Sequence, residues 1–274
     1  MPATDGKPLN QSNITAEMRD LYDYYYTSHE YSRRHPKPNN STLKFLFENG
    51  AGAAGNILDY GCGNGRYALP LLQSTQAQLT GYDISQSAIN EFASFIEESP
   101  LTKRTRLICS NSAELRQHGP YDLIMMLFGV LSHIGSRLER LKTLRLMRSL
   151  ITENGRLVLT VPSLFRRRPL ELLRATVSRA SGTATESLKE PGNIFFTRYI
   201  ANKEIDFFYH LYTVKGLNEE LQEAGFAICS LSPESLLPEW LITQFKLFEK
   251  IDAALLPLLP ASLGYGICVA AAPA

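Results

Sequence analysis

The sequence has few of the features that mark secreted, metal-binding or polyanion-binding proteins. Its 274 residues include 4 cysteines, which lie singly, without a CxxC pair or a Cys/His cluster. This scatter predicts reduced thiols and no metal site. The formal net charge is only +1, so strong overall attraction to nucleic acid or to an anionic membrane is not expected.

Long uninterrupted apolar runs are also missing. The N-terminal stretch MPATDGKPLN lacks the apolar centre of a signal peptide, so we expect a cytoplasmic protein. The stretch that begins at Ala253 is apolar over nearly a membrane thickness, but Pro257, Pro260, Gly264 and Gly266 interrupt it. We therefore expect a helix end, a loop and a final strand there, and no membrane span.

What the sequence does contain is a regular alternation of apolar strands and amphipathic helices. Strands are expected at NILDY, QLTGYDIS, TRLICSNS, YDLIMML and RLVLTV, with helical spacing between them. Runs such as LIMML and LVLTV are typical of parallel strands that are buried on both faces. The alternation predicts an α/β fold with a doubly wound, mostly parallel sheet. A long helix is expected over EWLITQFKLFEKIDAALL.

The stretch ILDYGCGNGRY carries the most specific signal. A phosphate-binding NTPase loop is excluded because GxxxxGK[ST] is absent. A dinucleotide loop, GxGxxG, fits poorly because the third glycine, Gly65, comes one residue early and Arg66 stands in its place. Asp59 precedes the loop; a carboxylate there disfavours a pyrophosphate and suits a ligand with an ammonium group.

These residues resemble the first motif of class I S-adenosylmethionine-dependent methyltransferases, an acidic residue followed after one position by GxGxG. The resemblance covers about residues 54–162 and resumes over 216–271. Asp83, at the end of GYDIS, matches the acidic residue that accepts hydrogen bonds from both ribose hydroxyls. Asn111 stands where the family usually has an Asp, and its side-chain carbonyl can still accept a bond from the adenine amino group.

The resemblance implies a seven-stranded sheet with an antiparallel C-terminal strand, GYGICVAA, and S-adenosylmethionine as cofactor. It implies one methyltransferase domain over 1–274, with N-terminal lid helices in 1–50, the cofactor-binding core in 54–162, a substrate cap inserted after the fifth strand in 163–215, and the rest of the core in 216–274. The expected cofactor-binding residues are Arg34, Asp59, Gly61, Cys62, Gly63, Asp83, Ile84, Asn111, Ser112 and Leu127.

Candidate residues for the reaction lie outside the glycine loop. Methyl transfer needs the acceptor held in line with the departing sulfur, and an acceptor hydroxyl or amine needs a group that manages its proton. Catalytic candidates are His133, Tyr209 and His210, and substrate-binding candidates are Tyr25, Arg198, Tyr199 and Tyr212. Each has a simpler alternative as a packing or surface residue. In the lid stretch YYYTSHEYSRRHPKP, Tyr24, Tyr25 and Tyr31 are expected to wall the pocket.

Three alternatives remain for the acceptor. The first is an O or N nucleophile of a small polar metabolite. The second is tRNA, since parts of the sequence also resemble methyltransferases of modified wobble uridines, and the insertion has a basic tract with Arg166, Arg167, Arg168, Arg174 and Arg179. The third is a non-catalytic cofactor-binding partner subunit. The sequence does not indicate the oligomeric state.

Overall fold

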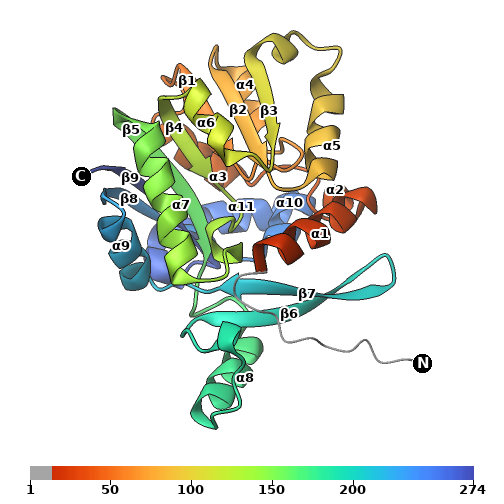
Figure 1. Ribbon diagram of the computed structural model, residues 1–274, viewed down its shortest axis with the longest axis vertical. Coiled ribbons are helices and arrows are strands. Elements are labelled where there is room, and N and C mark those ends of the chain that lie inside the picture. Colours follow the sequence, from red (N-terminus) through yellow and green to blue (C-terminus); the bar gives the residue numbers. More distant parts are fainter. Residues whose placement is uncertain (1–13) are drawn as a thin grey trace.

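A seven-stranded sheet forms the centre of the protein (Figure 1). The structure is a computed structural model and describes residues 14–274. The strand order is β3-β2-β1-β4-β5-β9-β8. Strands β1 to β5 pair in parallel, and β9 is antiparallel to both β5 and β8. The predicted fold class, including the antiparallel C-terminal strand, is confirmed. The sheet strands are β1 Asn56–Tyr60, β2 Gln78–Asp83, β3 Thr105–Cys109, β4 Tyr121–Met126, β5 Ile151–Pro162, β8 Phe226–Ser235 and β9 Gly266–Pro273.

Helices cover both faces of this sheet. Those of the core are α3 Asn40–Glu48, α4 Ala68–Ser74, α5 Gln86–Ile96, α6 Leu115–His118, α7 Arg137–Leu150, α9 Val214–Glu223, α10 Glu239–Gln244 and α11 Lys246–Leu255. The sequence of β4 is apolar without alternation because both faces of the strand are buried. Leu123 and Met125 belong to the core cluster under α3, α4 and α5, whereas Ile124 and Met126 belong to the cluster under α7 and α9.

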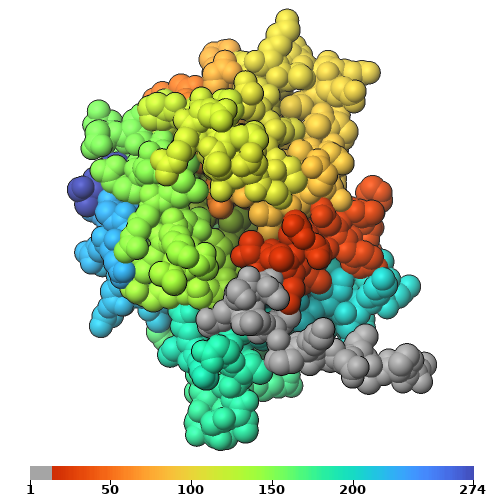
Figure 2. All heavy atoms as spheres, in the orientation of Figure 1, coloured from red at the N-terminus to blue at the C-terminus, as the bar shows by residue number. Residues whose placement is uncertain are grey.

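The N-terminal helices and the insertion after β5 lie together at one end of the sheet. Helices α1 Ile14–Thr27 and α2 Glu30–Arg34 precede the core, and the insertion contains α8 Pro169–Ala180 and the hairpin β6 Asn193–Ile200 with β7 Lys203–His210. Helix α1 packs on α5 and on β7, so it is held between core and hairpin (Figure 1). Figure 2 shows α8 and the base of the hairpin projecting below the core.

One predicted element is wrong. The long helix expected over EWLITQFKLFEKIDAALL is two helices, because Phe245 has an extended backbone, with φ −122°. The Asp252 carboxylate of α11 accepts hydrogen bonds of 2.8 Å from the backbone N–H groups of Leu236 and Leu237, just before α10. These two hydrogen bonds turn α11 back toward the start of α10.

Among residues 14–274, no helix has the length and apolar character needed to cross a membrane.

Candidate active site

A cavity of about 250 Å³ opens where β1, β2 and β4 end, on the carboxyl side of the sheet. In open α/β sheets this edge is where ligands bind. Five tyrosines contribute to its walls, and we call it the tyrosine-lined cavity: Tyr22, Tyr26, Tyr31, Tyr60 and Tyr82. Helices α1 and α2 supply the first three, so the N-terminal segment lies directly on the cavity.

The glycine loop forms one wall of this cavity. The backbone N–H groups of Gly61 and Cys62 donate to the Tyr82 carbonyl at 2.7 and 3.0 Å, which ties the loop to the end of β2. Gly63 has φ +53°, and a Cβ there would collide with the Tyr26 hydroxyl. Glycine is therefore required by the close approach of α1 as well as by the backbone conformation.

Two carboxylates lie near this wall: Asp83 is half-buried and lines the cavity, and Asp59 is buried near the end of β1. Asp83 accepts hydrogen bonds from the backbone N–H of Gly63 at 2.8 Å and of Ser85 at 2.9 Å, which hold its side chain in place. Burial raises the pKa of Asp83 to about 6. Burial and the neighbouring Asp83 raise the pKa of Asp59 well above its ordinary value. Two carboxylates that repel one another in a desolvated site favour a ligand that brings positive charge.

The expected cofactor-binding residues take different positions, and Asp59 and Gly63 lie beside the cavity without lining it. Gly61, Asp83, Ile84 and Leu127 line the tyrosine-lined cavity. The Cys62 side chain turns into the core, where a Cβ on Gly81 would approach its sulfur to 3.0 Å. Asn111 is exposed and its amide donates to Glu114, and neither Asn111 nor Ser112 contributes to the lining. Arg34 lines a different cavity, described below.

The same cavity is lined by His133, in a 3-10 turn Leu131–His133 that follows β4. Its Nδ1 lies 2.9 Å from the Phe208 carbonyl oxygen, and its Nε2 lies 2.8 Å from the Tyr22 hydroxyl. Because a carbonyl can only accept, Nδ1 carries the proton, which leaves Nε2 to accept from Tyr22. Burial, reinforced by Arg198, lowers the pKa of His133 to about 3, so the imidazole is neutral at physiological pH.

Tyr22 is the residue of this pair that the sequence did not indicate. Burial, reinforced by Tyr209, raises the pKa of Tyr22 well above its ordinary value, so it is a neutral phenol. Thr15, Met18, Tyr22 and Tyr26 all line the cavity at helical spacing. The phase of α1 would have pointed to Tyr22 and Tyr26, whereas we expected Tyr24, Tyr25 and Tyr31, of which only Tyr31 lines this cavity.

The aromatic candidates of the hairpin take separate positions. Tyr209 is buried beside His133, with ring centroids 4.5 Å apart. Tyr25 is buried, and its hydroxyl accepts a hydrogen bond of 3.4 Å from Arg198. Tyr199 is 71% exposed, and its hydroxyl donates to Glu204 on the neighbouring strand. The structure thus brings Tyr209 next to His133 and leaves Tyr199 at the surface.

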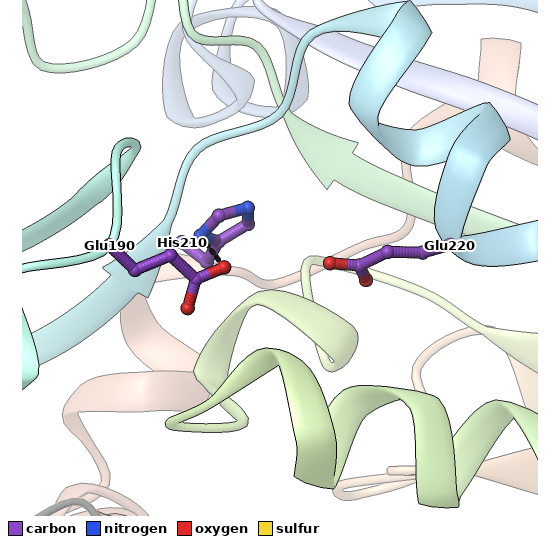
Figure 3. Close-up of side chains that lie close together, drawn as sticks. All are labelled: Glu190, His210 and Glu220. Atoms are coloured by element: carbon purple, nitrogen blue, oxygen red, sulfur yellow. Dashed lines mark ion pairs between the residues drawn. The ribbon is translucent and has the colours of Figure 1, made fainter.

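His210 and Tyr212 lie in a separate buried network. Figure 3 shows Glu190 and His210 side by side, with Glu220 of α9 pointing toward them from the opposite side. The buried Arg140 guanidinium donates to both Glu190 and Glu220, and the Tyr212 hydroxyl donates to Glu220 at 2.9 Å. The two carboxylates and His210 are close enough to hold a metal ion, but Arg140 already forms ion pairs with both carboxylates. Neither His210 nor Tyr212 lines the tyrosine-lined cavity.

Comparison with known proteins agrees with this geometry. A family model described as a methyltransferase domain matches residues 29–231. No curated protein matches the chain in sequence. One similar solved structure is the 1,6-didemethyltoxoflavin-N1-methyltransferase of Burkholderia thailandensis with bound 1,6-didemethyltoxoflavin and S-adenosylhomocysteine (TM-score 0.64, 15% identity, covering 98% of this chain and 93% of that one).

Two further solved structures share the fold. The CcbJ methyltransferase from Streptomyces caelestis has a TM-score of 0.60 at 15% identity, covering 97% of this chain and 100% of its own. The [4+2]-cyclase SpnF has a TM-score of 0.60 at 17% identity, covering 93% of this chain and 94% of its own. At these identities the likeness concerns the fold. Because the family model matches most of the chain, the protein belongs to the methyltransferase domain family, and the predicted class I, S-adenosylmethionine-dependent type is confirmed at the level of the family.

Proposed function

We propose that this protein transfers the methyl group of S-adenosylmethionine to an oxygen or nitrogen nucleophile of a small polar metabolite. One observation carries the proposal: a single cavity is lined by the Asp83 carboxylate, by Gly61 of the glycine loop and by the Tyr22–His133 pair. A cofactor held at Asp83 and Gly61 would share this cavity with a proton acceptor. Both the donor and the acceptor of a methyl group therefore have a place in one cavity.

The residues present fit the cofactor. Asp83 would accept hydrogen bonds from the ribose hydroxyls, Ile84 and Leu127 would lie against the adenine, and Asp59 would oppose the ammonium group. The positive φ of Gly61, Gly63 and Gly65 gives the loop a tight turn that glycine adopts without strain, and Gly61 lines the cavity. Bound there, the cofactor would supply an electrophilic methyl group on a sulfonium.

The chain's own residues would orient the acceptor and manage its proton. The cofactor would supply the methyl group to the acceptor atom and would keep the electron pair of the carbon–sulfur bond on its sulfur. The proton of the acceptor O–H or N–H passes to the Tyr22 oxygen, while the Tyr22 proton passes to Nε2 of His133. Nδ1 of His133 remains protonated against the Phe208 carbonyl, which stabilises the imidazolium that forms.

The low pKa of His133 bears on when the acceptor loses its proton. An imidazole with a pKa of about 3 is a weak base, so it suits transfer during or after methylation better than full deprotonation beforehand. Orientation in a closed cavity can supply a large part of the rate enhancement, about 7–11 kcal/mol in favourable systems. Tyr22, Tyr26 and Tyr31 of the N-terminal helices would exclude water, as expected of a lid.

The arrangement of the basic tract supports a small acceptor over tRNA. Arg167 and Arg168 turn toward an internal cavity and lie over the rings of Tyr265 and Phe196. Arg166 donates to the Leu263 carbonyl, and Arg179 donates to the Leu188 carbonyl. A phosphate-binding face needs arginines that point together into solvent. The Burkholderia neighbour, which binds a small molecule, supports the same preference.

Calorimetric binding of S-adenosylhomocysteine tests the cofactor assignment. Asp83→Ala should weaken binding at least about tenfold, since a buried carboxylate acceptor is lost. The matched control is Asp206→Ala, because Asp206 is exposed on the hairpin and, within residues 14–274, its carboxylate bonds only to Thr197. Equal affinity in Asp83→Ala and wild type would reject the assignment. Binding without methyl transfer to any fraction of a lysate would favour the partner-subunit alternative.

A further inference from the structure

A second cavity, of about 230 Å³, lies next to the tyrosine-lined cavity. Phe128, which follows β4, contributes to the lining of both and separates them. Four arginines contribute to its walls, and we call it the arginine-lined cavity: Arg34, Arg167, Arg168 and Arg198. They come from α2, from the segment before α8 and from β6, so three parts of the chain each send cations to one point.

The cations of this cavity are poorly neutralised. Arg168 pairs with Glu171 at 3.1 Å, but among residues 14–274 no carboxylate forms an ion pair with Arg34, Arg167 or Arg198. Glu239 also lines the cavity, but its carboxylate pairs at 2.7 Å with Arg66, which is itself buried.

Unsatisfied polar atoms accompany the excess of positive charge. The Nε–H donor of Arg198 is buried without a hydrogen-bond partner, and so are both ring nitrogens of His35, one a donor and one an acceptor, in a side chain that is 4% exposed. Buried donors are normally paired, and leaving them unpaired costs free energy. Burial and the nearby Arg198 lower the pKa of Arg34. Burial and the nearby Arg66 lower the pKa of His35 well below its ordinary value.

Aromatic rings hold the guanidinium groups in place. Arg167 lies 4.3 Å from the centroid of Tyr265, Arg168 lies 4.3 Å from that of Phe196, and Arg198 lies 5.1 Å from the same Phe196 ring. Such stacking orients a guanidinium while its N–H groups remain free to donate. The cavity therefore presents forked donors that are ordered before any anion arrives.

We infer that the arginine-lined cavity binds an anionic group, a carboxylate or a phosphate monoester, carried by the methyl acceptor. The inference rests on the proposed function and narrows its substrate class to acidic metabolites. Guanidinium forks match the geometry of both groups through paired hydrogen bonds. Since Phe128 lines both cavities, an acceptor anchored by its anion beside Phe128 would present its nucleophile toward Tyr22 and His133.

An anion bound in the arginine-lined cavity would also change the basicity of His133. Arg198 and Arg167 both lower the pKa of that imidazole, second to the effect of burial. An anion between these arginines offsets their charge and so makes Nε2 a better proton acceptor. The acidic substrate would thereby raise the basicity of the group that takes its proton, which ties binding to catalysis.

Binding of inorganic phosphate tests the cavity directly, at constant ionic strength with chloride as the counter-ion. The wild-type protein should bind phosphate, as followed by ³¹P line broadening. Arg198→Gln and Arg34→Gln should each weaken binding at least tenfold; Arg34 is exposed, so that variant keeps the test valid if Arg198→Gln does not fold. Arg174→Gln, an exposed arginine of α8 outside the cavity, is the matched control and should bind as the wild type does. Equal weakening in Arg174→Gln, or no phosphate binding, would overturn the inference.

The affinity for S-adenosylhomocysteine separates the two possible sources of the anion. If the arginines hold the acceptor, Arg198→Gln and Arg34→Gln leave this affinity within twofold of wild type. If they hold the carboxylate of the cofactor, the affinity falls at least tenfold, and the inference is wrong while the proposed function stands. Failure of the proposed function shows instead in Asp83→Ala, which lies in the other cavity.

Discussion

His133 and His210 lie near the same hairpin strand, yet they belong to two different kinds of site. His133 is half-buried and His210 is buried, and both have a lowered pKa and contact a tyrosine ring. His133 has one nitrogen against the Phe208 carbonyl and the other against Tyr22, at the edge of an open cavity. His210 faces Asn193 at 2.7 Å and the Glu190 carboxylate, inside a network closed by Arg140.

The difference shows that a Tyr-His pair in a sequence does not by itself mark a catalytic site. Burial lowers the pKa of both imidazoles by the same physical cause. What distinguishes them is the space next to the ring. His133 borders a cavity that also contains Asp83, whereas the neighbours of His210 are protein groups that satisfy one another. We therefore propose proton transfer for His133 and a structural role for His210.

The largest expected effect concerns the closed network. Arg140→Met leaves the carboxylates of Glu190 and Glu220 buried without a cation, and should lower the free energy of unfolding by about 3–5 kcal/mol. Urea denaturation measures this. The control is Arg145→Met on the same helix, where the pair with Glu223 is exposed and the change should stay below about 1 kcal/mol. Equal losses in the two variants would mean that the network is not the structural element described.

Substitution of the two histidines should separate catalysis from structure. His133→Gln should slow single-turnover transfer of labelled methyl at least about 100-fold, because the proton acceptor at the cavity is lost. His210→Gln should leave the rate per folded molecule near that of the wild type and lower only the melting temperature. Similar rate losses in both variants would contradict the assignment of distinct roles.

The pH dependence of stability should carry the signature of His133. Its pKa is about 3 when folded and about 6.5 when unfolded, so between these values the unfolded chain binds the extra proton and stability falls as pH falls. From pH 7 to pH 5 this contribution amounts to about 2 kcal/mol. Urea denaturation at the two pH values measures the loss of unfolding free energy. This loss should be smaller in His133→Gln than in the wild type by the amount just given. An identical loss in the variant would show that the imidazole is solvated.

A smaller effect is expected from the titration of Asp83 in the tyrosine-lined cavity. Because the pKa of Asp83 is about 6, its carboxylate becomes protonated below that pH and loses acceptor capacity toward the ribose. Affinity for S-adenosylhomocysteine should fall about tenfold between pH 7.5 and pH 5, as one protonated group predicts. Asp83→Asn should bind weakly with a flatter pH profile, and an unchanged slope would assign the titration to another group.

The core was predictable because its signals are local. Strand periodicity, the glycine loop and Asp83 lie within residues 54–162, and the order of motifs fixes the sheet. The hairpin in the insertion was missed, although Ala201 and Asn202, both with positive φ, make the kind of tight turn that favours Asn. The cap was expected as a segment, but its alternating pattern was not recognised as two strands.

The site was less predictable because distant segments build it. Tyr22 and His133 are 111 positions apart, and their contact depends on how α1 seats between the core and the hairpin. Arg34 and Arg198 meet only through the same packing, and their sequence neighbourhoods carry no shared motif. Phe245 breaks a helix that its periodicity favours, because the Asp252 contact to the preceding loop overrides local preference.

The fate of the methyl group tests the central claim most directly. The wild-type protein, labelled S-adenosylmethionine and a fractionated lysate should be incubated together, and label then measured in small molecules and in RNA. The proposed function predicts label in molecules below about 1 kDa, lost in Asp83→Ala and His133→Gln and retained in His210→Gln. Label in RNA, or small-molecule label that survives Asp83→Ala and His133→Gln, would contradict it.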